Sequence, residues 1–270
     1  MLRTRVFTAV LIATIGLLAL FSLPSEWFSL LAAIVLLGVG GWEAARLGGL
    51  NGAPARWLFG IVLLTIGLLV WHGMIGSPVP EAFWMGAALW LVLLVWLCRP
   101  GLGREDRSIW RVIKLISLGV ILLVAWLAVS WLQAGSPWHV LLLIFIISAA
   151  DIGAFFTGKH FGGAKLAPRI SPGKTWSGVA GGLVATVIVT ALASIWIPDS
   201  PFEPVTAGLI ALGLATISIG GDLLISLLKR HRQLKDTSDL LPGHGGVLDR
   251  FDSLGAALPF FALAIELLGR

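Results

Sequence analysis

The sequence predicts an all-α integral membrane protein with about nine transmembrane helices. Of its 270 residues, 57% are hydrophobic and only 12% are charged, whereas a soluble domain normally carries roughly 25% charged residues. Apolar runs of the length of a membrane span recur along the whole chain, and the cationic residues gather in every second connection between these runs. Most of the protein surface is therefore expected to face lipid.

Nine apolar runs account for most of the chain. A helix needs about 20 mostly apolar residues to cross the hydrocarbon core of a bilayer, and Pro, Gly or charged residues separate the runs, as expected between helices. We interpret the first run as a retained helix, because no small-residue cleavage site of a signal peptide precedes the next run. The expected spans cover residues 6–23, 27–47, 57–76, 82–98, 112–134, 137–156, 177–197, 205–228 and 253–269.

The distribution of charge predicts the orientation. With nine spans the connections alternate between the two sides, and positive charge collects on the cytoplasmic side. The N-terminus and the even-numbered connections, with the helix ends beside them, carry 18 of the 19 Lys and Arg residues, Arg270 being the exception. We therefore predict a cytoplasmic N-terminus and a C-terminus on the other side. The net charge of +5 belongs to this one face, so we expect membrane lipids and no nucleic acid as partners.

Residues that could carry chemistry divide the chain into two parts. Residues 1–135, with spans 1–5, are interpreted as a lipid-facing scaffold. Residues 136–270, with spans 6–9, are interpreted as a catalytic membrane region with cytoplasmic loops 157–176 and 229–252. Glu43 is the only acid within the first four runs and is expected at the membrane interface. Asp151 lies inside the sixth run, where an ionisable residue marks a functional site or a buried pair.

A segment rich in Gly, Ser, Thr and Lys precedes the seventh run. It reads Ser171-Pro-Gly-Lys174-Thr-Trp-Ser-Gly, and such residues near the start of a helix suit phosphate binding through backbone N–H groups. Its Gly-Lys-Thr string resembles the end of a P-loop, but Pro168 stands where that motif requires its first glycine. The segment alone fits a phosphate site or a solvated basic loop equally well.

The eighth run ends in a polar stripe. Asp222, Ser226 and Lys229 follow one another at i, i+4 and i+7, positions that share one face of a helix. An acid, a hydroxyl and a cation thus line the expected cytoplasmic end of this span. The alternative is an Asp–Lys arrangement within the helix that merely satisfies itself.

The connection after the eighth run is the densest in charge. Glycines flank His244, and their backbone is free to wrap an anion. Hard oxygen ligands for Mg²⁺ are available, and nearby cations can neutralise a triphosphate. Metal, cations and positioned donors are what nucleotidyl transfer requires; a merely solvated loop is the alternative. The carboxylates are those of Asp236, Asp249 and Asp252, and the cations are Lys229, Arg230, Lys235 and Arg250.

These residues in this order resemble the diagnostic stretch of the phosphatidate cytidylyltransferase family. The stretch reads Ser226-Leu-Leu-Lys-Arg, four residues, Lys-Asp, and then, from Leu241, Leu-Pro-Gly-His-Gly-Gly-Val-Leu-Asp-Arg-Phe-Asp252. Two upstream segments, residues 151–162 and 171–176, are also similar to the family. The resemblance covers residues 151–253, while the first half of the chain matches only in hydropathy.

The resemblance implies a reaction and its partners. It implies attack of a phosphatidic acid phosphate oxygen on the α-phosphate of CTP, giving CDP-diacylglycerol and pyrophosphate for phospholipid biosynthesis. It also implies dependence on Mg²⁺, leaves room for a second, monovalent ion, and implies a homodimer. The expected location is the bacterial inner membrane, with the active site on the cytoplasmic side.

The resemblance also implies roles for single residues. The best candidates for metal ligands are Asp222 and Asp249, with Asp236 and Asp252 as further candidates. The expected catalytic residues are Asp222, Ser226, Lys229, His244 and Asp249. The expected substrate-binding residues are Ser171, Lys174, Arg230, Lys235, Gly245, Gly246 and Arg250. His244 is a phosphate donor or a proton shuttle. Asp249→Asn is expected to abolish turnover and preserve folding.

Two departures and three rival functions remain open. Ser177 stands where the family is expected to carry Glu, and Thr237-Ser238 stands where an aromatic-glycine pair is expected. These departures also fit a divergent member of the family with a different lipid acceptor or reduced activity. A CDP-alcohol phosphotransferase would need an Asp-x-x-Asp-Gly-x-x-Ala-Arg pattern, which the sequence lacks. A polyprenol kinase, or a cytidylyltransferase for another lipid phosphate, would have a similar composition. A transporter would place Asp151 and Asp222 on a translocation path, yet the charges crowd one rim.

Overall fold

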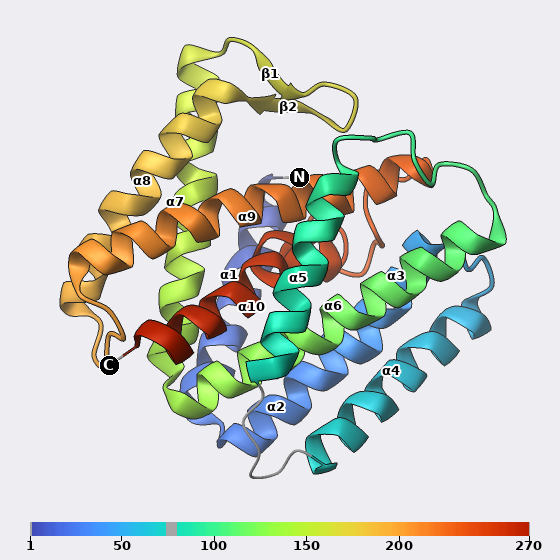
Figure 1. Cartoon of the computed structure of the whole chain (residues 1–270), viewed down its shortest axis with the longest axis horizontal. Helices are drawn as coiled ribbons and strands as arrows, with labels where there is room; N and C mark the ends of the chain where they lie inside the picture. Colours follow the sequence, from blue (N-terminus) through green and yellow to red (C-terminus); the bar gives the residue numbers. More distant parts are fainter. Residues whose placement is uncertain (1, 74–79, 270) are drawn as a thin grey trace.

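The chain folds into a bundle of long helices (Figure 1). A computed structural model describes residues 2–73 and 80–269, so the end of the third expected span (74–76) and Arg270 lie outside the described residues. The helices are α1 (Leu2–Ser22), α2 (Ser25–Ala33), the π-helix η1 (Ile34–Val39), α3 (Gly40–Gly48), α4 (Ala53–Gly73), α5 (Pro80–Trp96), α6 (Ser108–Gly135), α7 (Pro137–Phe161), α8 (Trp176–Trp196), α9 (Pro204–His231) and α10 (Leu248–Leu268).

Seven helical stretches in the described ranges are long and apolar enough to cross a membrane. This finding confirms the predicted class, a helical membrane protein. The helices α2, η1 and α3 run on without a break and form one of the seven, and the others are α4 and α6–α10. The apolar part of α1 (Val6–Ser22) and α5 are shorter. Each of the nine expected spans nevertheless coincides with a helical stretch.

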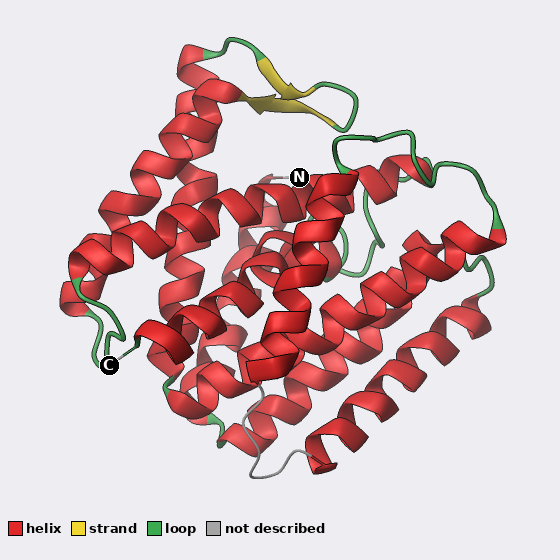
Figure 2. Ribbon diagram, in the orientation of Figure 1, coloured by secondary structure: helices red, strands yellow, loops and turns green. Residues whose placement is uncertain are grey.

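The loop predicted for residues 157–176 is largely ordered instead. α7 continues to Phe161, and two short strands follow, β1 (Lys165–Ala167) and β2 (Ser171–Thr175) (Figure 2). They pair antiparallel, with Lys165 opposite Thr175. The all-α prediction missed this hairpin, which begins where Gly162 and Gly163 take positive φ values of 61° and 91° and turn the chain out of α7. Thr175 then caps α8, its Oγ1 accepting from the Gly178 N–H at 3.1 Å.

Small residues let α7 and α8 pack closely along their length. A Cβ added at Gly182 would lie 2.7 Å from the Ala150 carbonyl oxygen, so only glycine fits there. Between α2 and α6, buried polar groups are paired across the two helices: Trp126 Nε1 donates to the Ser29 carbonyl at 2.9 Å, and the hydroxyls of Ser29 and Ser130 lie 2.9 Å apart. Such pairing is required where no water is available to satisfy the donors.

The cation-rich connections meet at one end of the bundle. In Figure 1 the hairpin, the α5–α6 connection and the α9–α10 connection lie away from the C-terminus and the α8–α9 connection. Three arginine contacts hold this end together: one joins the α9–α10 connection to the α3–α4 connection, one joins α9 to the hairpin, and one joins α3 to the α9–α10 connection. They are Arg232 Nη2 to Asn51 Oδ1 (2.6 Å), Arg230 Nε to the Ile170 carbonyl (3.2 Å) and Arg46 Nη1 to the Thr237 carbonyl (2.9 Å). The alternation of charge seen in the sequence therefore has a counterpart in the fold.

The contact between α4 and the π-helical region gives a prediction for stability. A Cβ at Gly60 would collide with the Gly38 carbonyl oxygen and lie 3.2 Å from the Trp42 nitrogen. Because these are backbone atoms, we expect Gly60→Val to cost about 1–3 kcal/mol and to lower the melting temperature in detergent. Gly213→Val is the control, since a Cβ there meets nothing within 4 Å. Equal melting temperatures for the two variants would contradict this packing.

Candidate active site

The polar stripe at the end of α9 forms as predicted, but its partners lie on other elements. Ser226 Oγ donates to Asp222 Oδ1 at 3.2 Å. Lys229 forms its ion pair with Asp249 at the start of α10, at 2.7 Å, and Asp222 forms its ion pair with Lys174 of β2. The Asp–Lys pair within α9 that we had considered is therefore not the arrangement found. The stripe connects the hairpin to α10.

Asp222 and Asp252 bring two carboxyl groups together. Their side chains are close enough to share a hydrogen bond, and two carboxylates at such a distance repel each other unless a proton or a cation lies between them. This donor set suits a hard divalent ion. Among the described residues, no three Asp, Glu, His or Cys side chains are grouped so that they could hold a metal ion by themselves. Mg²⁺ held here would therefore take its other ligands from water and substrate phosphates, as it usually does.

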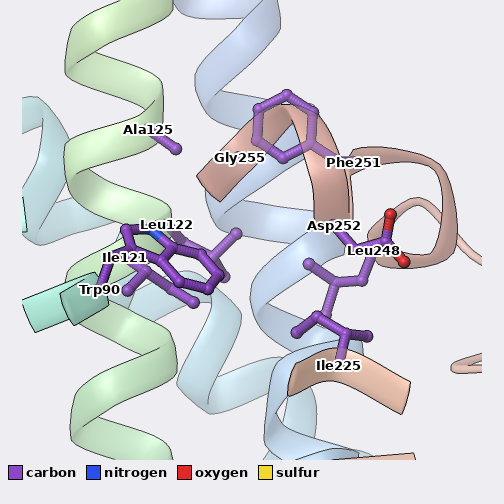
Figure 3. A pocket seen from close by; sticks show the side chains of 9 residues that line it. All are labelled: Trp90, Ile121, Leu122, Ala125, Ile225, Leu248, Phe251, Asp252 and Gly255. Atoms are coloured by element: carbon purple, nitrogen blue, oxygen red, sulfur yellow. The ribbon is translucent and has the colours of Figure 1, made fainter. Parts of the chain in front are cut away.

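An apolar wall lies behind Asp252. A cavity of about 20 Å³ is enclosed by residues of α5, α6, α9 and α10, among them Trp90, Ile121 and Ile225. Figure 3 shows the Asp252 carboxylate pointing away from Trp90 and Ile121. Such a volume holds at most about one water molecule, and a lining without polar partners keeps it dry. On this side, Asp252 therefore borders mostly apolar side chains.

Asp249 is buried and is fully engaged by donors of the chain itself. Oδ1 accepts from Lys229, and Oδ2 accepts from the Thr237 N–H (2.7 Å), the Thr237 hydroxyl (2.8 Å) and the Gly246 N–H (2.9 Å). The side chains of Lys229 and Asp249 are 10% and 3% exposed. The loop expected up to residue 252 ends earlier, because α10 begins at Leu248. Asp249 is thus held inside the protein, whereas the Asp222 side chain is 26% exposed.

Gly245 and Gly246 wrap anions, as the sequence suggested, but those anions belong to the protein. Gly245 has a φ of 80°, and a Cβ there would lie 2.6 Å from Asp249 Oδ2. A Cβ at Gly246 would collide with Thr237 Oγ1 and Glu43 Oε1. Glycine is therefore required so that the backbone can approach two carboxylates closely.

Glu43, which we expected at the membrane interface, is buried among polar groups of the site. Glu43 is 0% exposed. Its carboxylate accepts hydrogen bonds from the Ser238 hydroxyl and from the backbone N–H groups of Val247 and Leu248, and it lies 3.2 Å from the Thr237 hydroxyl. Glu43 was not among the site residues predicted from the sequence. A signal was present, because an acid at membrane depth marks a site or a buried pair, which is the rule we applied to Asp151.

The other predicted residues lie around these clusters. The His244 N–H donates to the Leu241 carbonyl at 2.8 Å, and its buried Nδ1 has no partner among the described protein atoms. Arg250 Nε donates to the His244 carbonyl. Arg230 fastens the hairpin through Ile170. Ser171 lies at the start of β2, and the side chains of Lys235 and Asp236 are exposed on the loop. The structure does not bring Lys235 and Asp236 into the cluster.

A cleft adjoins the carboxyl pair. Its volume is about 500 Å³, and it lies between α7, the hairpin, α8 and Ile219 of α9, within the size range of small-molecule sites. Three lysines line it, Lys159, Lys165 and Lys174, together with Asp151 and several glycines. From the sequence, we had counted Lys159 and Lys165 only among the cations of the predicted cytoplasmic side. Because Lys174 also pairs with Asp222, the cleft opens beside the carboxyl pair and can accept a polyanion.

The burial of Asp249 changes our expectation for Asp249→Asn. The substitution would leave the Lys229 ammonium buried without its counter-charge, and breaking such a pair costs about 3–5 kcal/mol. We therefore expect a clearly lower melting temperature in detergent. Asp222→Asn is the matched control, because the Asp222 side chain is 26% exposed and its partner Lys174 is 28% exposed. A melting temperature of Asp249→Asn no lower than that of Asp222→Asn would contradict the buried pair.

Comparison with known proteins identifies the family of the chain. A model of the cytidylyltransferase family matches residues 3–268. A protein of Pseudomonas aeruginosa named phosphatidate cytidylyltransferase is 37% identical, with 97% of this chain and 96% of that protein covered. One of Haemophilus influenzae with the same name is 35% identical, with 97% and 98% covered. One of Bacillus subtilis is 42% identical over 45% of each chain. The chain belongs to the cytidylyltransferase family.

Proposed function

We propose that this chain transfers the cytidylyl group of CTP to phosphatidic acid, giving CDP-diacylglycerol and pyrophosphate. The observation that carries the proposal is the near full-length similarity to two bacterial proteins named phosphatidate cytidylyltransferase. The geometry supports it independently. A cleft lined by three lysines adjoins a pair of carboxyl groups, which is the combination of charges that nucleotidyl transfer requires.

The lysines of the cleft bind the triphosphate in this proposal. Lys159, Lys165 and Lys174 supply positive charge along one wall, and the glycines between them let phosphate oxygens approach the backbone. An oxygen of the lipid phosphate attacks the α-phosphorus, and the bond from that phosphorus to the oxygen bridging to the β-phosphate breaks. The lysines then stabilise the charge of the departing pyrophosphate.

We place the divalent ion of this proposal on Asp222 and Asp252. Mg²⁺ bound there would supply positive charge against the phosphates. Ser226 and Lys174 orient Asp222 through the contacts described above. Asp249 and Asp236 were also candidates. Asp249 is engaged by the chain's own donors and Asp236 is exposed, so we give them no ligand role. We assign no residue to a second, monovalent ion.

We propose nine spans, counting α1 and α5, with the N-terminus and the cleft on the cytoplasmic side. Two observations support this orientation. The cation-rich connections lie together at one end of the bundle, and an excess of Lys and Arg is typical of the cytoplasmic side. The relatives are bacterial, which supports the inner membrane. A homodimer, and a catalytic region formed by residues 136–270, complete the proposal.

Lys174→Ala tests the nucleotide side of the cleft. It removes a cation from the cleft and the partner of Asp222, so we expect kcat/KM for CTP to fall about 10- to 100-fold, the cost of losing a hydrogen bond to a charged group. Arg169→Ala is the matched control, because Arg169 is an exposed cation of the same hairpin that does not line the cleft. Equal values of kcat/KM for Lys174→Ala and Arg169→Ala would remove Lys174 from the nucleotide site.

The reaction itself is tested by incubating the purified protein in detergent with radiolabelled CTP and phosphatidic acid, with and without Mg²⁺. We expect labelled CDP-diacylglycerol and an equal amount of pyrophosphate, both dependent on Mg²⁺. A folded protein that labels polyprenol phosphate or another lipid phosphate, and not phosphatidic acid, would keep the reaction class and change the acceptor. Absence of any labelled lipid would refute the proposal.

A further inference from the structure

One carboxylate of the N-terminal half reaches into the site. Glu43 lies on α3, about 200 positions before its partners in the sequence, and is fully buried. Its Oε1 accepts from the Ser238 hydroxyl (2.6 Å) and the Val247 N–H (3.0 Å). Its Oε2 accepts from the Leu248 N–H (2.8 Å) and lies 3.2 Å from the Thr237 hydroxyl. The Thr237 hydroxyl also lies 2.8 Å from Asp249 Oδ2, so its single proton is directed to Asp249. Glu43 therefore has three donors of its own, and they come from both ends of the α9–α10 connection.

A second residue of α3 holds the same segment. Arg46, one turn after Glu43, donates from Nη1 to the Thr237 carbonyl at 2.9 Å. The π-helix η1 directly precedes α3, and π-helical turns change which side chains of a helix share a face. The start of α3 is thus fixed by packing: Gly41 lies against Gly60 of α4, so close that a Cβ would be 3.0 Å from the Gly60 Cα. Glu43 is therefore held on a rigid element.

Glu43 also serves as the cap of α10. Val247, the residue before α10, makes no side-chain cap, and α10 begins at Leu248. The Val247 and Leu248 N–H groups that open the helix donate to Glu43 instead, and a negative charge is favourable at a helix N-terminus. Asp249 follows directly, and Asp252 stands four residues after Leu248, one turn along the helix. Any shift of this first turn moves both carboxylates.

We propose that Glu43 is a positioning residue of the cytidylyl transfer, because it sets the first turn of α10 and with it the contacts of Asp252 with Asp222 and of Asp249 with Lys229. This inference rests on the proposed function. Glu43 does not line the nucleotide cleft. Its loss is therefore expected to act on turnover and to leave the binding of CTP nearly unchanged.

Glu43→Gln is the central variant, because it keeps the shape of the side chain. The amide nitrogen cannot accept hydrogen bonds, so the donors at one of the two side-chain oxygens lose their acceptor. We expect kcat to fall roughly 10- to 100-fold, as small misplacements in an active site do, with KM for CTP changed by less than about 3-fold. Hydrogen exchange at the amides of Val247 and Leu248 should accelerate in the same variant.

Two controls separate positioning from loss of stability. Glu26→Gln removes an exposed carboxylate and should behave as wild type. Leu132→Ala opens a cavity in the fully buried core of α6, so it should lower the melting temperature while the folded protein keeps its kcat. A kcat of folded Glu43→Gln equal to wild type, or a loss matched by Leu132→Ala, would overturn the proposal.

A double-mutant cycle with Ser238→Ala tests the contact itself. If Glu43 acts through this segment, the two substitutions are not additive in kcat, and the double variant resembles Glu43→Gln alone. Additive effects would overturn the proposal. Should wild type label no lipid, the proposed function fails, and hydrogen exchange alone then decides the inference: unchanged protection of the Val247 and Leu248 amides in Glu43→Gln would overturn it.

Discussion

Two buried carboxylates, those of Glu43 and Asp249, organise the connection between α9 and α10. A charged group removed from water is costly unless hydrogen bonds and counter-charge replace its hydration. Here the backbone N–H groups of residues 237 and 246–248, with two hydroxyls and the Lys229 ammonium, take that role. The loop folds around these anions, and its glycines are needed because donors and backbone must come this close.

Ion pairs and hydrogen bonds connect the charged clusters of the site to one another. Lys174 joins the hairpin to Asp222, and Lys229 joins the same face of α9 to Asp249. Arg230, the next residue along α9, fastens the hairpin from the other side through the Ile170 carbonyl. The hairpin that lines the cleft and the carboxyl pair are therefore both anchored to the end of α9. This arrangement suits a reaction whose catalysis depends mainly on placing phosphates against fixed charges.

Sequence reasoning found what depends on local periodicity. The stripe of Asp222, Ser226 and Lys229 follows from helical spacing, and the expected spans match helices because apolar length is a local property. Glu43 was misjudged because its partners are about 200 residues away, and no periodicity links a carboxylate to donors at that distance. The hairpin was missed for a similar reason, since β1 is only three residues long and its pairing depends on where Gly162 and Gly163 turn the chain.

The two departures from the family pattern, Ser177 and Thr237-Ser238, lie where separate elements of the fold are held together by hydrogen bonds. The Thr237 hydroxyl donates to Asp249 and the Ser238 hydroxyl donates to Glu43, whereas a glycine in place of Ser238 would offer no side-chain donor to Glu43. Ser177 donates to the Gly162 carbonyl and so ties the start of α8 to the end of α7. Within the described part of the chain, neither departure lines the cleft that carries the three lysines. The departures therefore alter how the elements around the site are held together, and they leave the charges of the cleft unchanged.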